Sequence, residues 1–158
     1  MSVTFYPGAS SVGSTVFTNS LPVSNDYGVN SQGGPQGIMR IKNLSENSFL
    51  NNQPGYLAST GIDNSWLSAQ WEILPVNGTT YFLIRNRWKN NYVSTENNNM
   101  LSDNAQSTRS MWSLQDVGGN NTYIIRNAAT NYTLVLQNGI LNISPLFRCQ
   151  ANAQWVIE

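Results

Sequence analysis

The segment "SAQWEIL" (Ser68 to Leu74) places a tryptophan between a glutamine and an alternating apolar stretch. The same pattern closes the sequence as "ANAQWVIE" (Ala151 to Glu158) and occurs less faithfully as "RSMWSLQ" (Arg109 to Gln115). A pattern that recurs at nearly constant spacing predicts an internal repeat of about 42 residues. The tryptophans of the three segments, 41 and then 43 positions apart, are Trp71, Trp112 and Trp155.

Three further features recur in one order between these tryptophans. The segments "MRIKN", "FLIRN" and "YIIRN" each end in a basic residue and an asparagine. Six residues after that asparagine begins a short apolar segment, "FLN", "YVS" or "TLV", and a turn and a leucine follow it. Four landmarks in one order predict three repeats, at residues 37–77, 78–117 and 118–158. The asparagines are Asn43, Asn86 and Asn127, and the leucines are Leu57, Leu101 and Leu141.

The local patterns indicate β-strands. Segments such as "TTYFLIRN" and "QWVIE" are rich in β-branched and aromatic residues, and Asn-Gly pairs at 77–78 and 138–139 mark tight hairpin turns. Propellers need more than three units, and helical arrays need helical patterns that this sequence lacks. Three units of four short strands therefore predict an all-β protein, a β-trefoil over residues 37–158. Its expected core contains the three tryptophans together with Ile41, Ile84 and Ile125.

Residues 1–36 do not follow the period. They are rich in serine, glycine and asparagine, as a linker would be, but they also carry apolar residues such as Val3, Phe5, Val16 and Phe17. Two interpretations stay open for this N-terminal extension. It is either an arm that packs along the barrel or against a partner chain, or a partly ordered tail.

Composition excludes several classes of partner. The 158 residues include eight basic and eight acidic side chains, and charged residues make up 10% of the chain. There is no basic stripe to neutralise phosphates, so we expect no nucleic acid partner. No apolar stretch approaches the roughly 20 residues of a membrane-spanning helix, so we expect no membrane insertion.

The inventory of reactive side chains argues against catalysis. The sequence contains no histidine, which removes Ser-His-Asp and Cys-His schemes as well as the commonest metal ligand. Cys149 is the single cysteine and has no histidine to activate it. We therefore expect no enzymatic activity, no cofactor and no metal. The first residues lack a basic segment followed by an apolar run, which favours a cytoplasmic protein or one released without a signal peptide.

The order "I-(R/K)-N … Y-L … N-G-x-L … Q-W-x-I" resembles that of the ricin-type (ricin B-like) β-trefoil lectins, especially the small cysteine-poor forms. The resemblance covers residues 37–158 and implies a carbohydrate-binding function. In that family each sugar site looks to be built from an aspartate two residues after the aromatic of the "Y-L" step. An aromatic ring further on and an asparagine shortly before the closing tryptophan complete it.

The residues of this chain depart from that pattern. The aspartate position is occupied by Asn51, Ser94 and Val135, so no repeat keeps the carboxylate. The first repeat retains an amide and an exposed-looking tryptophan, and the third retains the asparagine before its closing tryptophan. The resemblance therefore implies altered carbohydrate sites, whose candidate residues are Asn51, Trp66, Asn138, Phe147 and Asn152.

A second candidate platform comes from the residues themselves. The segment "NRWKNN" places Trp88 between two basic residues in an expected turn, where an exposed indole could stack against a ligand. Ser94 and Asp103 flank the next turn and could add polar contacts. The alternative interpretation is a hairpin tip that rests on the barrel.

The resemblance and the neutral, asparagine-rich composition together favour a non-catalytic lectin with diverged sugar sites, whose partners are glycans or glycoproteins. Useful avidity would come from several sites or from a homodimer, with residues 1–36 as a candidate contact. The rival interpretation is a protein-binding β-trefoil, such as a protease inhibitor or an interaction subunit of a toxin complex. The missing aspartates favour that rival.

Overall fold

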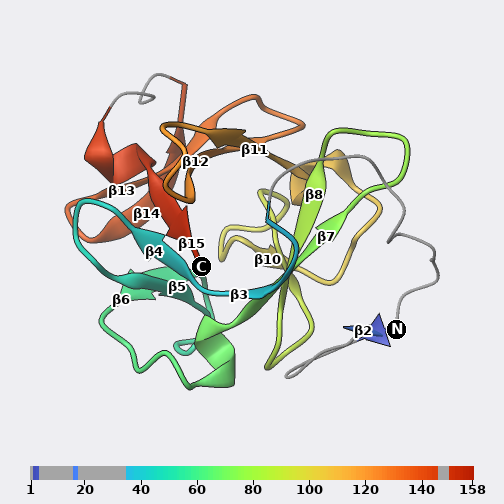
Figure 1. Cartoon of the computed structure of the whole chain (residues 1–158), viewed down its shortest axis with the longest axis horizontal. Helices are drawn as coiled ribbons and strands as arrows, with labels where there is room; N and C mark the ends of the chain where they lie inside the picture. The colour runs from blue at the N-terminus through green and yellow to red at the C-terminus, as the bar shows by residue number, and fades with distance from the viewer. Residues whose placement is uncertain (1, 4–15, 18–34, 146–149) are drawn as a thin grey trace.

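The computed structural model describes residues 2–3, 16–17, 35–145 and 150–158 (Figure 1). Near the N-terminus, β1 (Ser2–Val3) pairs with β2 (Val16–Phe17) in a separate antiparallel sheet. The other residues from 1 to 34, and Cys149, lie outside the described residues, so the two interpretations of the extension stay predictions. Among the residues that the structure describes, no helix has the length and apolarity to cross a bilayer.

The described part of residues 37–158 is built from thirteen strands in one antiparallel sheet, with three single-turn 3-10 helices between them. The first strands are β3 (Gly37–Met39), β4 (Ile41–Asn43), β5 (Phe49–Asn51), β6 (Ala58–Thr60) and β7 (Trp71–Pro75). Next come β8 (Phe82–Asn86), β9 (Tyr92–Val93), β10 (Leu101–Ser102) and β11 (Trp112–Asp116). The last are β12 (Thr122–Asn127), β13 (Thr133–Gln137), β14 (Ile140–Ser144) and β15 (Trp155–Ile157). The helices are η2 (Leu67–Ala69), η3 (Thr108–Ser110) and η4 (Ala151–Ala153).

The sheet closes on itself as a barrel. Strand β7 pairs with β8, β8 with β11, β11 with β12, β12 with β15 and β15 with β4. Strand β3, which precedes β4 directly, pairs with β7 and completes the ring (Figure 1). The pairs β5–β6, β9–β10 and β13–β14 form three hairpins outside this ring. This arrangement is the β-trefoil that the repeats predict, and the predicted fold is confirmed.

The three repeated tryptophans lie in the core, each with no exposed surface. Every indole N–H donates to a backbone carbonyl of its own repeat: Trp71 to Leu50, Trp112 to Val93 and Trp155 to Leu134, at 2.8–3.1 Å. A buried polar group needs such a partner, and here the partner is always seven residues after the repeated asparagine. The core packing of the tryptophans, and of Ile41, Ile84 and Ile125, is therefore confirmed.

The repeated asparagines explain why the "I-(R/K)-N" pattern recurs. In each repeat the side-chain Oδ1 accepts hydrogen bonds from the backbone N–H groups two and three residues later, which fixes a tight turn. The side-chain Nδ2 donates to a carbonyl three residues before a repeated tryptophan, which ties that turn to a 3-10 helix. We call these residues the clamp asparagines; they are Asn43, Asn86 and Asn127.

The turn chemistry also agrees with the sequence. Asn138 and Gly139 have φ angles of 54° and 76° and form the two-residue connection between β13 and β14. Both residues therefore adopt the left-handed region that an Asn-Gly hairpin requires. The residue four positions after each clamp asparagine, Asn47, Asn90 or Asn131, also has a positive φ.

Candidate functional site

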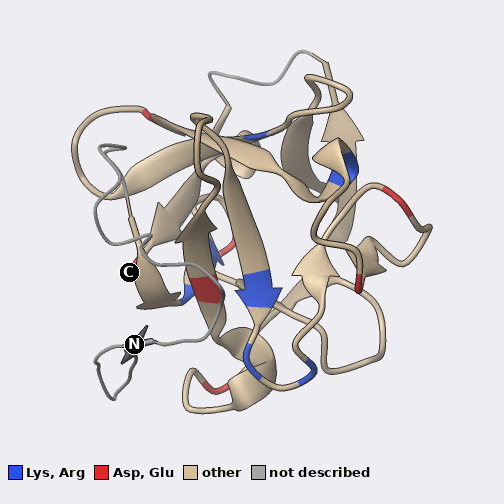
Figure 2. Cartoon of the chain, turned by 90° about the vertical axis from the view of Figure 1, so that its right-hand side faces the viewer, with Lys and Arg blue, Asp and Glu red and all other residues tan. Residues whose placement is uncertain are grey.

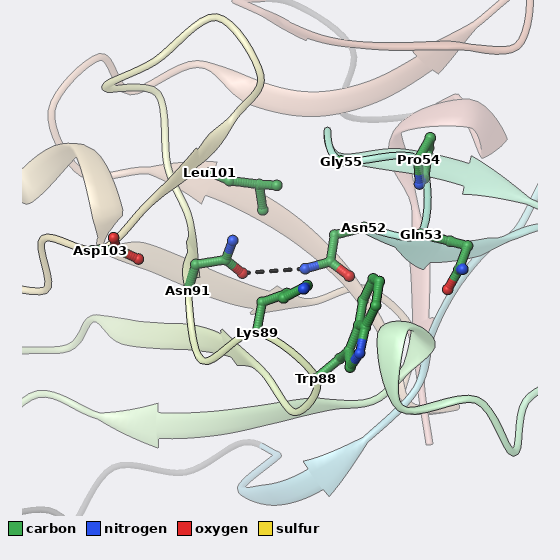
Figure 3. Close-up of a pocket in the computed structure, with 9 residues that line it drawn as sticks. All are labelled: Asn52, Gln53, Pro54, Gly55, Trp88, Lys89, Asn91, Leu101 and Asp103. Carbon is green, nitrogen blue, oxygen red and sulfur yellow. Dashed lines mark hydrogen bonds between the residues drawn. The ribbon is translucent and has the colours of Figure 1, made fainter.

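A groove of about 530 Å³ opens where the first repeat meets the second (Figure 3). One wall is the turn that follows β5, and the other is the turn between β8 and β9. The start of β10 and the residues after it close the far end. We call this depression the junction groove. Its lining residues are Asn52, Gln53, Pro54, Gly55, Trp88, Lys89, Asn91, Leu101 and Asp103.

One backbone carbonyl holds both walls together. The oxygen of Ser68, in η2, accepts a hydrogen bond from the N–H of Asn52 at 3.1 Å. It also accepts one from Nδ2 of Asn86 at 3.0 Å. A third link ties the turn after β5 to the turn between β9 and β10, where Leu57 N–H donates to the carbonyl of Asn99 at 2.9 Å. Because these contacts involve backbone, the walls are positioned before any ligand arrives.

The clamp asparagine of the second repeat presents Trp88 to solvent. Oδ1 of Asn86 accepts from the N–H groups of Trp88 and Lys89, at 2.8 and 3.1 Å. Asn86 N–H and Asn90 N–H close the same turn through backbone bonds to Asn91 and Asn86. As a result the indole of Trp88 is 41% exposed on a rigid turn. The ammonium of Lys89 lies 4.3 Å from the centroid of that indole, a cation–π contact.

The middle of the groove is made of amides. Nδ2 of Asn52 donates to Oδ1 of Asn91 across the repeat boundary at 3.2 Å (Figure 3). Asn52 is 2% exposed, and its own Oδ1 has no hydrogen-bond partner among the described residues. A buried acceptor without a donor is rare and costs free energy, so it marks a place where a donor would be stabilising.

Asp103 supplies a carboxylate at the end of the groove away from Trp88 (Figure 3). It is exposed, and the described residues offer it no hydrogen bond or ion pair. Elsewhere basic and acidic residues are interspersed along the chain, as Figure 2 shows for one side of the molecule. Glu72 pairs with Arg85 across β7 and β8. Burial alone would lower the pKa of Arg85, but the charge and hydrogen bonding of Glu72, together with those of Tyr92, outweigh it and raise that pKa.

The residues implied by the resemblance are not gathered at this groove. Asn51 is 1% exposed and its polar atoms are used locally, because Nδ2 donates to Phe49 and Thr60 while Oδ1 accepts from Gln53 N–H. Trp66 is half exposed at the start of η2. Asn138 lies in the exposed β13–β14 turn.

Asn152 is half-buried in η4, and its carbonyl accepts from the clamp Asn43. Phe147 lies outside the described residues. These five positions therefore stay untested as a sugar site.

Of the second candidate platform (Trp88, Ser94 and Asp103), two residues lie in the groove. Trp88 and Asp103 both line the junction groove, whereas Ser94 is fully buried and its Oγ accepts from the N–H of Glu96. Sequence reasoning missed Asn52, Gln53 and Asn91 as groove residues. The segment "NNQPG", a polar turn after a strand, was the available signal, but nothing in it indicates which other repeat it faces.

The other two repeat junctions lack this chemistry. Two and three residues after the clamp asparagine, the second repeat has Trp88 and Lys89. The corresponding pairs are Ser45 and Glu46 in the first repeat and Ala129 and Thr130 in the third. Nine residues after the clamp, Asn52 corresponds to Thr95 and Leu136. The three repeats thus share their fold, but the residues that line the groove occur at one of the three repeat junctions.

Comparisons with known proteins place this fold. No family model matches the sequence, and no curated protein matches it. Among solved structures, the designed threefold symmetric protein ThreeFoil matches with a TM-score of 0.68 at 14% identity, over 77% of this chain and 97% of its own. SeviL, solved bound to the asialo-GM1 saccharide, matches with a TM-score of 0.66 at 16% identity, over 78% and 98%.

A third match is an enzyme. The GlcNAcα1-4Gal-releasing endo-β-galactosidase from Clostridium perfringens matches with a TM-score of 0.67 at 18% identity, over 76% of this chain. The match spans 31% of the enzyme's own length. The structural neighbours thus include a protein solved with a bound saccharide as well as part of an enzyme, and identities this low establish architecture alone. The chain therefore has the β-trefoil fold, which it shares with ThreeFoil and SeviL.

Proposed function

We propose that the protein is a non-catalytic carbohydrate-binding protein, a lectin, and that it binds sugar in the junction groove. The observation that carries this proposal is the exposed indole of Trp88, held on a clamped turn beside amides and a carboxylate that have free hydrogen-bonding capacity. The fold shared with SeviL, which binds a saccharide, supports the same conclusion by analogy.

The groove matches the chemistry of a pyranose. The part of the indole that Lys89 leaves exposed offers an apolar surface for the C–H face of the ring. Asp103 can accept two hydroxyl protons in charge-assisted hydrogen bonds, and the amides of Gln53 and Asn91 can both donate and accept. The same lining argues for binding without hydrolysis. Asp103 is the one carboxylate among the nine lining residues, whereas glycoside hydrolysis canonically uses a pair of carboxyl groups.

We expect Trp88→Ala to weaken binding to any recognised glycan by about thirtyfold, because truncating a central aromatic anchor typically costs about 2 kcal/mol. A glycan array would identify a recognised sugar, and titration calorimetry would measure both affinities. Trp66→Ala is the matched control, since Trp66 is also about half exposed but lies outside the groove. A large loss from Trp66→Ala and none from Trp88→Ala would move the site to η2. No binding to any glycan at millimolar concentration would refute the lectin function.

We also expect one ligand per chain. The aromatic, ammonium and amide groups meet at the boundary between the first and second repeats, while the corresponding positions elsewhere carry Ser45, Ala129 or Leu136. Calorimetry of the purified protein should therefore give a stoichiometry of one, and the monomeric protein should not cross-link glycan-coated beads. A stoichiometry of two or three would show that another junction binds as well.

A further inference from the structure

The groove face of Trp88 is not bare. Figure 3 shows the Lys89 side chain reaching into the space between Trp88 and Asn52, and its ammonium lies 4.3 Å from the indole centroid. The turn fixes the backbone of both residues through Asn86, and the ammonium of Lys89 rests over the ring of its neighbour. What the groove presents at this end is therefore a cation resting on an indole, and such a cation favours an anionic group of a ligand in a charge-assisted hydrogen bond.

The opposite end has the opposite charge. Asp103 lies away from Lys89, with Asn91 between them in Figure 3, and the two side chains do not form an ion pair. The Asn52–Asn91 amide pair occupies the space between the two ends. The groove therefore has a cationic end and an anionic end, joined by neutral hydrogen-bonding groups.

A neutral sugar can use the amides and Asp103, but it has no negative charge to pair with Lys89. To stack on the groove face of Trp88 it must displace the ammonium and break the cation–π contact. A sugar with an acidic substituent can instead use the ammonium where it is, in a charge-assisted hydrogen bond. The adjoining neutral sugar can donate its hydroxyls to Asp103, which keeps the two negative charges at opposite ends.

We propose that the junction groove prefers acidic saccharides, with a carboxylate or sulfate substituent on Lys89 and hydroxyls of a neighbouring neutral sugar on Asp103. This inference rests on the proposed function, because it specifies the ligand class of the same groove. Lys89 is then the residue that determines specificity, and Trp88 positions it.

The experiment compares disaccharides that differ in one group. Lactose and cellobiose would each be tested as the neutral sugar, as the derivative oxidised to a uronic acid at C6, and as the 6-O-sulfate. Binding to the purified full chain would be measured by calorimetry at two salt concentrations. The carboxylate and sulfate arms distinguish the two sources of the anion.

The matched variants are Lys89→Met and Lys42→Met, which replace the two lysines of the chain in turn. Each removes one positive charge, but Lys42 lies in β4, outside the groove. We expect at least one acidic form to bind the unmodified protein about tenfold more tightly than its neutral parent, as one charge-assisted contact predicts. That ratio should fall to about one in Lys89→Met, persist in Lys42→Met, and shrink as salt is raised.

Two results would overturn this inference and leave sugar binding intact. The first is equal affinity of the unmodified protein for neutral and acidic forms. The second is an acid preference that survives in Lys89→Met. Failure of every one of these sugars to bind, together with a negative glycan array, would instead contradict the proposed function itself.

Discussion

Replacing Trp112 by alanine is expected to lower the free energy of unfolding by about 3–5 kcal/mol, the range for removing a large buried aromatic side chain. Trp112 has no exposed surface, and its indole N–H donates to the carbonyl of Val93 at 2.8 Å. The substitution leaves a cavity in the core and an unpaired buried carbonyl, so both penalties apply. Urea denaturation followed by circular dichroism measures the change.

Because a domain of this size is stable by only about 5–15 kcal/mol, Trp112→Ala could unfold it outright. Trp112→Phe keeps most of the volume and should cost about 1–3 kcal/mol, chiefly for the orphaned Val93 carbonyl. Trp88→Ala serves as the comparison, because that indole is 41% exposed and should cost much less. Equal destabilisation by Trp112→Ala and Trp88→Ala would contradict the core assignment.

The second large effect is expected at Asn86. Asn86→Ala removes the acceptor for two turn N–H groups and the donor to the Ser68 carbonyl, all made by a side chain with no exposed surface. We expect a loss of about 2–4 kcal/mol in unfolding free energy, since three hydrogen bonds and a buried partner are affected. We also expect weaker glycan binding, because the same side chain positions Trp88 and Lys89.

Asn127→Ala is the matched control for that second effect. Asn127 clamps the third repeat in the same way, through the N–H groups of Ala129 and Thr130 and the carbonyl of Arg109. It should destabilise the fold by a similar amount and leave the affinity of the remaining folded protein unchanged. If the two variants impaired binding equally, Asn86 would have no role beyond general stability.

The sequence was informative about the fold because the same physical requirement recurs three times. A buried indole needs a carbonyl, and a tight turn needs a side-chain acceptor, so Trp71, Trp112 and Trp155 and the clamp asparagines had to repeat. Those repeats predicted the β-trefoil and the core positions Ile41, Ile84 and Ile125, and the structure confirms both.

The candidate site was only half predictable. Trp88 stood out as an aromatic residue in a turn, and Asp103 as a carboxylate near the next one. Asn51 and Asn52 are indistinguishable in the sequence, yet the first is committed to bonds within its own hairpin and the second faces Asn91. Which of these two neighbouring amides faces the groove depends on the direction in which the chain leaves β5. The sequence around them does not indicate that direction.

The sequence by itself determined that three similar units form one closed barrel. The spacing of the repeated residues and the alternation of apolar and polar residues can both be read along the chain. The tertiary structure alone decided that Asn52 meets Asn91, 39 positions away, beneath Trp88 and Lys89. The physical reason is the closure of the barrel. When β7 pairs with β8, and η2 lies beside the clamp Asn86, one turn of the first repeat faces one turn of the second. A groove made from two repeats exists only once that ring has formed.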